Sequence, residues 1–260
     1  GEDTLIVSTS GRYEFRNKGI DVFIDAMNRL RFDERLNKKV VAFVDVPAWV
    51  GSAREDLAER LNASPNTVFD TPLPCPMLTH WLHNMEHDNV LTMLRALDFA
   101  NNKQDKVKII FVPCYLNGND GIFNMPYYDL ILGNDICVYP SYYEPWGYTP
   151  LEAVAFSIPC VTTDLAGFGI WAQQVLEADK AENNLSNGVK VVHRTDYNYH
   201  EVADEIKDAV ANYALLPKTA VTKAREKAKS LSKKALWKKF IAYYNEAYHM
   251  ALTKTEERTK

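Results

Sequence analysis

The chain has 260 residues, of which 47% are apolar, and its formal net charge at pH 7 is −4. This composition can bury a large hydrophobic core, and the small negative charge excludes the general attraction of a strongly basic protein to nucleic acid or anionic membranes. No apolar run reaches the roughly 18 to 20 residues that cross a bilayer, so we expect a cytoplasmic protein that binds neither nucleic acid nor membranes.

Short apolar segments alternate along the chain with amphipathic segments of helical periodicity. The predicted strands are Thr4–Ser10, Val40–Val46, Val107–Pro113, Ile136–Pro140, Cys160–Thr163 and Val189–His193. The predicted helices are Gly19–Arg31, Arg54–Leu61, Val90–Asn101, Thr149–Ser157, Gly169–Ala178, His200–Leu215, Lys218–Ser230 and Lys233–Ala251.

The strands are apolar almost throughout rather than alternating, as expected when helices cover both faces of a sheet. The predicted fold class is therefore α/β, a Rossmann-like doubly wound parallel sheet with C-terminal helices. We assign residues 1–215 to the Rossmann-like domain and residues 216–260 to helices that pack on it.

The segment Ala48–Asp88 interrupts the alternation with a helical stretch and a proline-rich turn, Thr71–Pro76. We interpret it as an insertion at the ligand-binding edge of the sheet. Within it, His80, His83 and His87 recur at helical spacing, which would suit a metal. No fourth ligand is evident, and we predict no metal site.

The first polar connection, Ser8–Gly19, leaves a strand and enters a helix. Gly11 permits a tight turn after the strand. Arg12, Arg16 and Lys18 follow just ahead of the helix N-terminus, where cations can help to grip an anion such as a diphosphate. A solvated basic loop is the alternative interpretation of the same spacing.

The second connection lies within Tyr139–Glu152, where Thr149 is a natural N-cap and Pro150 a natural first helical residue. Glu144 and Glu152 place two carboxylates around this helix terminus. They would repel a phosphate unless they serve another part of the ligand, such as sugar hydroxyls. A favourable helix-dipole interaction would explain Glu152 alone but not Glu144.

A third connection, Thr162–Gly169, is again a glycine-bearing loop between a strand and a helix. Together these loops resemble those of glycogen synthases of the animal and fungal type. The matching segments are Gly11–Gly19, His83–Met85, Lys106–Phe111, Pro140–Pro150 and Gly167–Gly169. The run from Pro140 to Pro150 is the most specific of them.

The resemblance implies a retaining glycosyltransferase of the two-lobed GT-B fold, of which this chain is the C-terminal, donor-binding lobe. It implies that Arg12 and Lys18 hold the donor diphosphate and help the leaving group to depart. Glu144 would contact the transferred glucose, so these three residues are the expected catalytic set.

The resemblance also implies a set of substrate-binding residues. Tyr127 would stack on the base, Glu152 would bind the ribose, and backbone amides around Tyr148 and Thr149 would receive phosphate. The full expected set is Tyr127, Trp146, Gly147, Tyr148, Thr149 and Glu152.

The implied reaction transfers glucose from UDP-glucose or ADP-glucose to the non-reducing end of an α-1,4-glucan with retention. No cofactor or metal is expected, because two cations and a helix terminus can stabilise the leaving diphosphate. The glucan would bind through an N-terminal lobe absent from this chain, which alone would be inactive. The resemblance also allows a homo-oligomer in the full enzyme.

Two alternatives remain open at this point. The chain could belong to another retaining GT-B glycosyltransferase with a different sugar or acceptor, or be a non-catalytic nucleotide- or glucan-binding module. One region departs from the family: the helix expected to carry regulatory arginines, within Lys218–Phe240, holds mainly lysines and only Arg225. Lysine cannot reproduce a bidentate arginine clamp, so we interpret this region as a solvated face or, alternatively, an anion or partner site.

Overall fold

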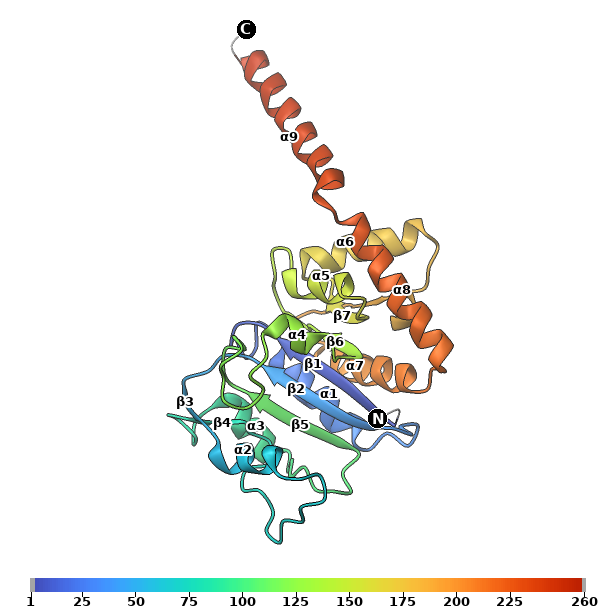
Figure 1. The fold of residues 1–260 in the computed structure, drawn as a ribbon. Helices are drawn as coiled ribbons and strands as arrows, with labels where there is room; N and C mark the ends of the chain where they lie inside the picture. The colour runs from blue at the N-terminus through green and yellow to red at the C-terminus, as the bar shows by residue number, and fades with distance from the viewer. Residues whose placement is uncertain (1–2, 259–260) are drawn as a thin grey trace.

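The computed structural model describes residues 3–258 and is built on a six-stranded parallel sheet with the order β5-β2-β1-β6-β7-β8 (Figure 1). Its strands are β1 (Thr4–Ser10), β2 (Lys39–Asp45), β5 (Val107–Val112), β6 (Ile136–Val138), β7 (Cys160–Thr163) and β8 (Val189–Val192). The strand order reverses between β1 and β6. In doubly wound sheets, ligands bind at the carboxyl ends of the strands beside such a reversal.

Helices cover both faces of this sheet. On one face, α1 (Ile20–Leu30), α3 (Asn89–Ala96) and α7 (Tyr199–Ala214) pack together with the sheet in one buried apolar cluster. On the other face, residues of α4 (Tyr127–Ile131), α5 (Tyr148–Ala155) and α6 (Gly167–Ala178) form a second cluster. The predicted α/β doubly wound sheet is therefore confirmed.

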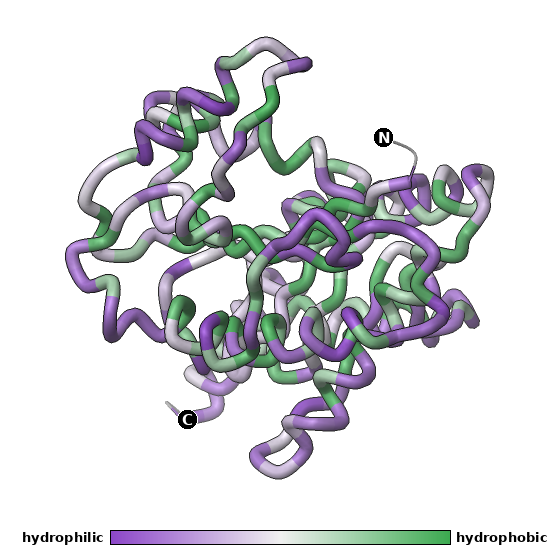
Figure 2. The backbone as a smooth tube through the Cα atoms, turned by 90° about the horizontal axis from the view of Figure 1, so that it is seen from below, coloured by the Kyte–Doolittle hydropathy of each residue, from purple (hydrophilic) through white to green (hydrophobic). Residues whose placement is uncertain are grey.

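Successive strand residues point into the two clusters in turn. In β6, Val138 belongs to the first cluster and Cys137 to the second; in β7, Val161 and Cys160 divide in the same way. Both sides of β6 and β7 are buried, which explains their continuous apolar sequences. Figure 2 shows these hydrophobic segments running through the middle of the molecule, with hydrophilic segments around the periphery.

The predicted elements match the observed ones closely, and β1 and β7 match to the residue. One clear difference is the helix predicted over Val90–Asn101, since α3 ends at Ala96. Beyond it, Asn101 adopts a left-handed φ of 51°, and its side chain bonds the backbone N–H and C=O of Ile109 at 3.0 and 2.7 Å. Asn101 thus extends the hydrogen bonding of β5 instead of continuing the helix.

The segment 48–88 contains a small antiparallel hairpin of β3 (Val50–Ala53) and β4 (His80–Leu82), which flank α2 (Glu55–Asn62). The sequence did not predict these strands, because they are short and their pairing joins residues about thirty positions apart. His80 lies in β4, so the helical spacing inferred for His80, His83 and His87 was wrong.

Two helices close the chain. α8 (Lys218–Lys234) packs against α5 and a short 3-10 turn, η1 (Leu185–Asn187). α9 (Trp237–Arg258) projects away from the body, and none of its described residues is buried (Figure 1). The predicted packing of both C-terminal helices on the domain therefore needs correction for α9, which contacts the domain through Phe240 near its start.

Candidate functional site

Three loops meet at the carboxyl edge of the sheet, beside the reversal of strand order. The loop after β6 pairs with the loop after β7: Glu144 N–H donates to the Leu165 carbonyl at 3.3 Å, and Gly167 N–H donates to the Glu144 carbonyl at 3.1 Å. Tyr142 N–H donates to the Asn17 carbonyl of the loop after β1 at 2.7 Å. Backbone hydrogen bonds therefore fix Glu144 between its neighbours.

Close approach of these loops depends on glycine. A Cβ on Gly19, whose φ is +66°, would lie 2.0 Å from the Pro140 carbonyl oxygen. A Cβ on Gly169 would lie 1.9 Å from the Thr163 carbonyl oxygen. Both distances are too short for any side chain, so glycine is required where α1 abuts the end of β6 and α6 abuts the end of β7.

The ammonium of Lys18 donates to the carboxylate of Glu144 in a direct ion pair, and the two side chains are only 16% and 22% exposed. A Cβ on Gly11 would lie 4.0 Å from Lys18 Cδ, so the aliphatic part of Lys18 lies across this glycine. The structure thus brings together two of the predicted catalytic residues from loops 126 residues apart.

The other two cations of the first loop have different surroundings. The Arg12 side chain is 77% exposed and pairs with Glu14 at 2.9 Å, within reach of solvent at the same edge. Arg16 instead lines a cavity of about 660 Å³ on the α1 side of the loop. The three cations therefore do not form one cluster.

Helix α5 begins at this edge with Tyr148 and Thr149. Its N-cap is Gly147 at φ 105°, and no side chain caps it, so the prediction of Thr149 as the N-cap was wrong. The left-handed φ turns the chain directly into the helix two residues earlier than expected. The first N–H groups of α5 consequently lack a side-chain acceptor and can receive an anion.

Tyr127 and Glu152 are linked through a residue that the sequence did not single out. The Tyr127 hydroxyl bonds the Ser10 hydroxyl at 2.7 Å, and its ring lies 5.5 Å from that of Tyr128. The Tyr128 hydroxyl donates to Glu152 Oε1 at 2.9 Å. Burial raises the pKa of Tyr127, which therefore stays a neutral phenol.

Trp146 lies in an aromatic cluster. Its indole ring is 6.1 Å from the ring of Phe168, 6.0 Å from that of Trp171 and 5.4 Å from that of Phe240, and the residue is half-buried. The indole therefore fixes the loop to α6 and α9. Its predicted contact with substrate stays a prediction.

Asp45 is a further residue at this edge that the sequence interpretation missed. It ends β2 and lines a cavity of about 220 Å³ together with Tyr127. Burial raises the pKa of its carboxyl to about 7. Its only signal in the sequence was its position as the last residue of an apolar strand.

One group among the described residues could offer three metal ligands: His80, Cys114 and Asp120, whose ligand atoms lie within 4.8 Å of one another. Both ring nitrogens of His80 already have polar partners, the Thr79 hydroxyl at 2.8 Å and the Asp120 carbonyl at 2.7 Å. Burial also raises the pKa of Cys114 to about 12, which keeps its thiol protonated. We assign this group no metal.

Within residues 3–258, no helix has the length and apolar character needed to cross a membrane. The family model described as glycogen synthase matches residues 1–62 and 66–258. Similar proteins include glycogen [starch] synthase isoform 1 of Saccharomyces cerevisiae, 26% identical, and the glycogen [starch] synthase of Neurospora crassa, 28% identical, each over 96% of this chain. The human liver glycogen [starch] synthase is 28% identical over 97% of this chain.

The chain spans less than half the length of these relatives, 43%, 42% and 42% respectively. Among solved structures, it is similar to WaaG, a glycosyltransferase involved in lipopolysaccharide biosynthesis, with a TM-score of 0.47 and 15% identity. That similarity covers 90% of this chain and 46% of the other.

Proposed function

The chain belongs to the glycogen synthase family, and on that premise we propose that it is the donor-binding lobe of a retaining glucosyltransferase. The proposed reaction moves glucose from a nucleotide diphosphate glucose to the 4-hydroxyl at the end of an α-1,4-glucan. The observation that carries this proposal is the contact of Lys18 with Glu144 at the reversal of strand order. A cation and a carboxylate side by side suit a ligand with a diphosphate next to a sugar.

The diphosphate is proposed to bind between Lys18, Arg12 and the N-terminus of α5. The aliphatic part of Lys18 lies against Gly11, whereas Arg12 is exposed and, among the described residues, pairs with Glu14. The N–H groups at the start of α5 add the positive end of the helix dipole. Together these groups stabilise the charge that develops as the glycosidic bond breaks.

The glucose is proposed to contact Glu144. In the structure Glu144 neutralises Lys18, and when a diphosphate takes Lys18 the carboxylate becomes available to sugar hydroxyls. Glu144 then stands beside the reacting carbon without having to bond to it. Retention follows if the acceptor hydroxyl attacks on the face that the diphosphate leaves, where the departing phosphate can take its proton.

The nucleoside is proposed to extend toward α4. Tyr127 offers an aromatic ring for the base, and Glu152 offers carboxylate oxygens for the ribose hydroxyls. Tyr128 connects the two, since it contacts the Tyr127 ring and donates to Glu152. This placement uses the same carboxyl edge as the diphosphate.

Calorimetric titration of the chain with UDP, ADP and UDP-glucose tests the proposal. We expect saturable binding of one diphosphate nucleotide, weakened by about 1.5–3 kcal/mol, or roughly tenfold to a hundredfold, in Lys18→Ala and in Arg12→Ala. Lys223→Ala is the matched control, because Lys223 is an exposed lysine on α8.

Glu144→Gln separates the proposed role of Lys18 in binding the diphosphate from the proposed role of Glu144 in turnover. It removes the carboxylate that competes for Lys18, so the chain should bind UDP at least as tightly as before. The same substitution in the complete enzyme should abolish most turnover. Absence of nucleotide binding, or equal binding by the lysine variants at positions 18 and 223, would contradict the proposal.

A further inference from the structure

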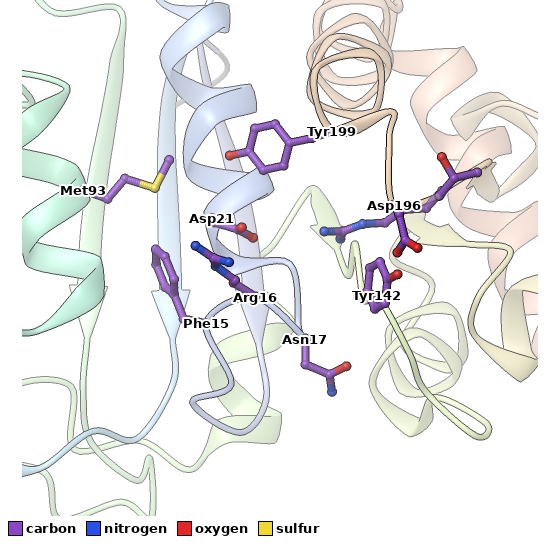
Figure 3. Close-up of a pocket in the computed structure, with 10 residues that line it drawn as sticks. Phe15, Arg16, Asn17, Asp21, Met93, Tyr142, Asp196 and Tyr199 are labelled. Carbon is purple, nitrogen blue, oxygen red and sulfur yellow. The ribbon is translucent and has the colours of Figure 1, made fainter.

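Two cavities border the carboxyl edge of the sheet, one on each face. The larger, about 660 Å³, lies beside α1 and α7, and Figure 3 shows Arg16 and Asp21 on one side of it, facing Tyr142 on the other. The smaller, about 220 Å³, lies on the opposite face, between the sheet and α4. Sites that take a whole small molecule usually measure roughly 300–1,000 Å³. The smaller cavity therefore suits one part of a ligand, such as a single ring system.

Apolar side chains line the smaller cavity from two sides. Ile6 and Phe43 belong to β1 and β2, whereas Phe123 comes from the loop after β5 and Leu130 from α4. The rings of Phe43 and Phe123 meet edge to face, with their centroids 6.2 Å apart. A lining of this kind favours a flat group with weakly polar faces.

The side-chain polar groups that lack partners in this cavity are acceptors. The carboxylate of Asp45 makes no hydrogen bond or ion pair with another described residue. Asn134 is 7% exposed; its amide nitrogen donates to the Ser8 hydroxyl at 2.7 Å, and its amide oxygen has no donor among the described residues. The Tyr127 hydroxyl is already bonded to that of Ser10. A group that enters the cavity satisfies these acceptors only if it brings hydrogen-bond donors.

The cavity adjoins the place proposed for the nucleoside. Tyr127, whose ring is proposed to pack on the base, also lines the cavity. The next residue, Tyr128, donates at 2.9 Å to Glu152, the proposed ligand of the ribose. A base that extends from the ribose and packs on Tyr127 can therefore reach the Asp45 carboxylate with its outer edge.

We propose that Asp45 selects the base of the donor nucleotide by accepting a hydrogen bond from the exocyclic amino group of adenine or cytosine. The proposal rests on the proposed function. Uracil carries a carbonyl oxygen where cytosine carries its amino group. That oxygen would face the carboxylate with no hydrogen between them, and both acceptors would stay unsatisfied in a desolvated space. An amino group instead gives the carboxylate the donor that it lacks.

Calorimetric titration of the chain with CDP, ADP and UDP at pH 8 tests this selection. Burial raises the pKa of Asp45 to about 7, so its carboxyl is ionised at that pH. We expect CDP or ADP to bind at least about tenfold more tightly than UDP, the value of one hydrogen bond to a charged group. CDP and UDP have rings of the same size, so their comparison isolates the amino group. The comparison of ADP with CDP shows whether the cavity takes a purine or a pyrimidine.

Asp45→Asn should bring the affinities for the three nucleotides within about threefold of one another. The main change should be tighter binding of UDP, because the asparagine amide can donate to the uracil carbonyl. The variant keeps the size of the side chain and removes a desolvated charge, so it should fold at least as stably as the wild type.

Asp129→Asn is the matched control, because Asp129 is exposed on the same helix as Tyr127 and does not line the cavity. It should keep the wild-type preference among the nucleotides. Binding of UDP by the wild type as tight as that of CDP and ADP would overturn the selection and leave the proposed function intact. A preference for CDP or ADP that Asp45→Asn retains would assign the selection to another group and also overturn it. Failure of all three nucleotides to bind would contradict the proposed function itself.

Discussion

At the scale of single residues, Asp45 is an acidic group near the site whose environment disfavours its charged form. Its carboxylate makes no hydrogen bond or ion pair with another described residue, although it ends β2 beside a cavity. Desolvation alone raises its pKa from 3.8 to about 7. A carboxylate that has neither a hydrogen bond nor an ion pair lowers the stability of the folded chain. Its position beside Tyr127 is consistent with a role in binding.

This carboxyl group predicts a pH-dependent stability. Below about pH 4 it is protonated in both the folded and the unfolded chain and contributes nothing. Between about pH 4 and 7 the unfolded chain releases the proton while the folded chain keeps it, so stability falls as pH rises. Above about pH 7 the carboxyl is ionised in both states, and the folded chain bears the full free-energy cost of desolvating the charge.

Asp45→Asn should therefore raise the thermal midpoint relative to the wild type more at pH 8 than at pH 5. Thermal unfolding of both proteins at the two pH values measures this difference. Asp196→Asn serves as the control, because that carboxylate is exposed. An equal effect of Asp45→Asn at both pH values would show that burial does not perturb the carboxyl.

At the scale of elements, the segment 48–88 is organised around one buried cation. Arg54 is 0% exposed and donates to the carbonyls of Cys75 and Leu78 at 2.7 and 3.0 Å and to Pro74 at 2.6 Å. It also bonds Asp56 and lies 4.4 Å from the Trp81 ring centroid. The Arg54 side chain thus fixes the position of the proline-rich turn, which lies about twenty residues later in the chain.

Arg54→Met should release this turn, because three carbonyls would lose their donor. The main cost falls on the carbonyl of the buried Leu78, since a buried acceptor without a partner costs about 1–3 kcal/mol. Hydrogen exchange read by mass spectrometry should show faster exchange over residues 71–82 and unchanged exchange in β1 and β6.

Arg60→Met is the matched control for Arg54→Met. Within the described part of the chain, the Arg60 side chain contacts the Thr71 carbonyl and the Phe69 ring, so its replacement should have a small effect. Equal exchange in the two variants would mean that Arg54 does not organise the segment.

At the scale of the whole molecule, the long helix α9 projects away from the body (Figure 1). Its aromatic residues Trp237, Tyr244 and Tyr248 are 59%, 49% and 62% exposed. Its first turns contact the domain through Phe240, whose ring lies 5.4 Å from that of Trp146 and 5.7 Å from that of Trp171. The stability of the domain should therefore depend on Phe240 and not on the rest of the helix.

Truncation of the chain after Ala242 should leave the thermal midpoint within about 2 °C of the wild-type value. Phe240→Ala should lower it by a few degrees, because it removes about 1.5 kcal/mol of apolar burial. Differential scanning calorimetry distinguishes the two. A large loss on truncation would show that the outer turns of α9 pack on the domain in solution.

Local sequence patterns were sufficient to predict the parallel sheet, most helix boundaries and the loops of the site. These follow from local information: apolar segments fix the strands, helical periodicity fixes the helices, and glycines mark the turns between them. Because parallel strands bring their carboxyl ends to one edge, the same reasoning predicted that Lys18 and Glu144 lie at a common site. The resemblance then supplied their expected roles.

Which polar residues lie around the same cavity or site could be learned from the packed structure and not from the sequence. Lys18 and Arg16 are two positions apart, yet one contacts Glu144 and the other lines the large cavity with Tyr142 and Tyr199. The sequence likewise did not predict the β3–β4 pairing or the position of the Trp146 indole. Such contacts join residues tens to more than a hundred positions apart, and they depend on how whole elements pack, which no local pattern records.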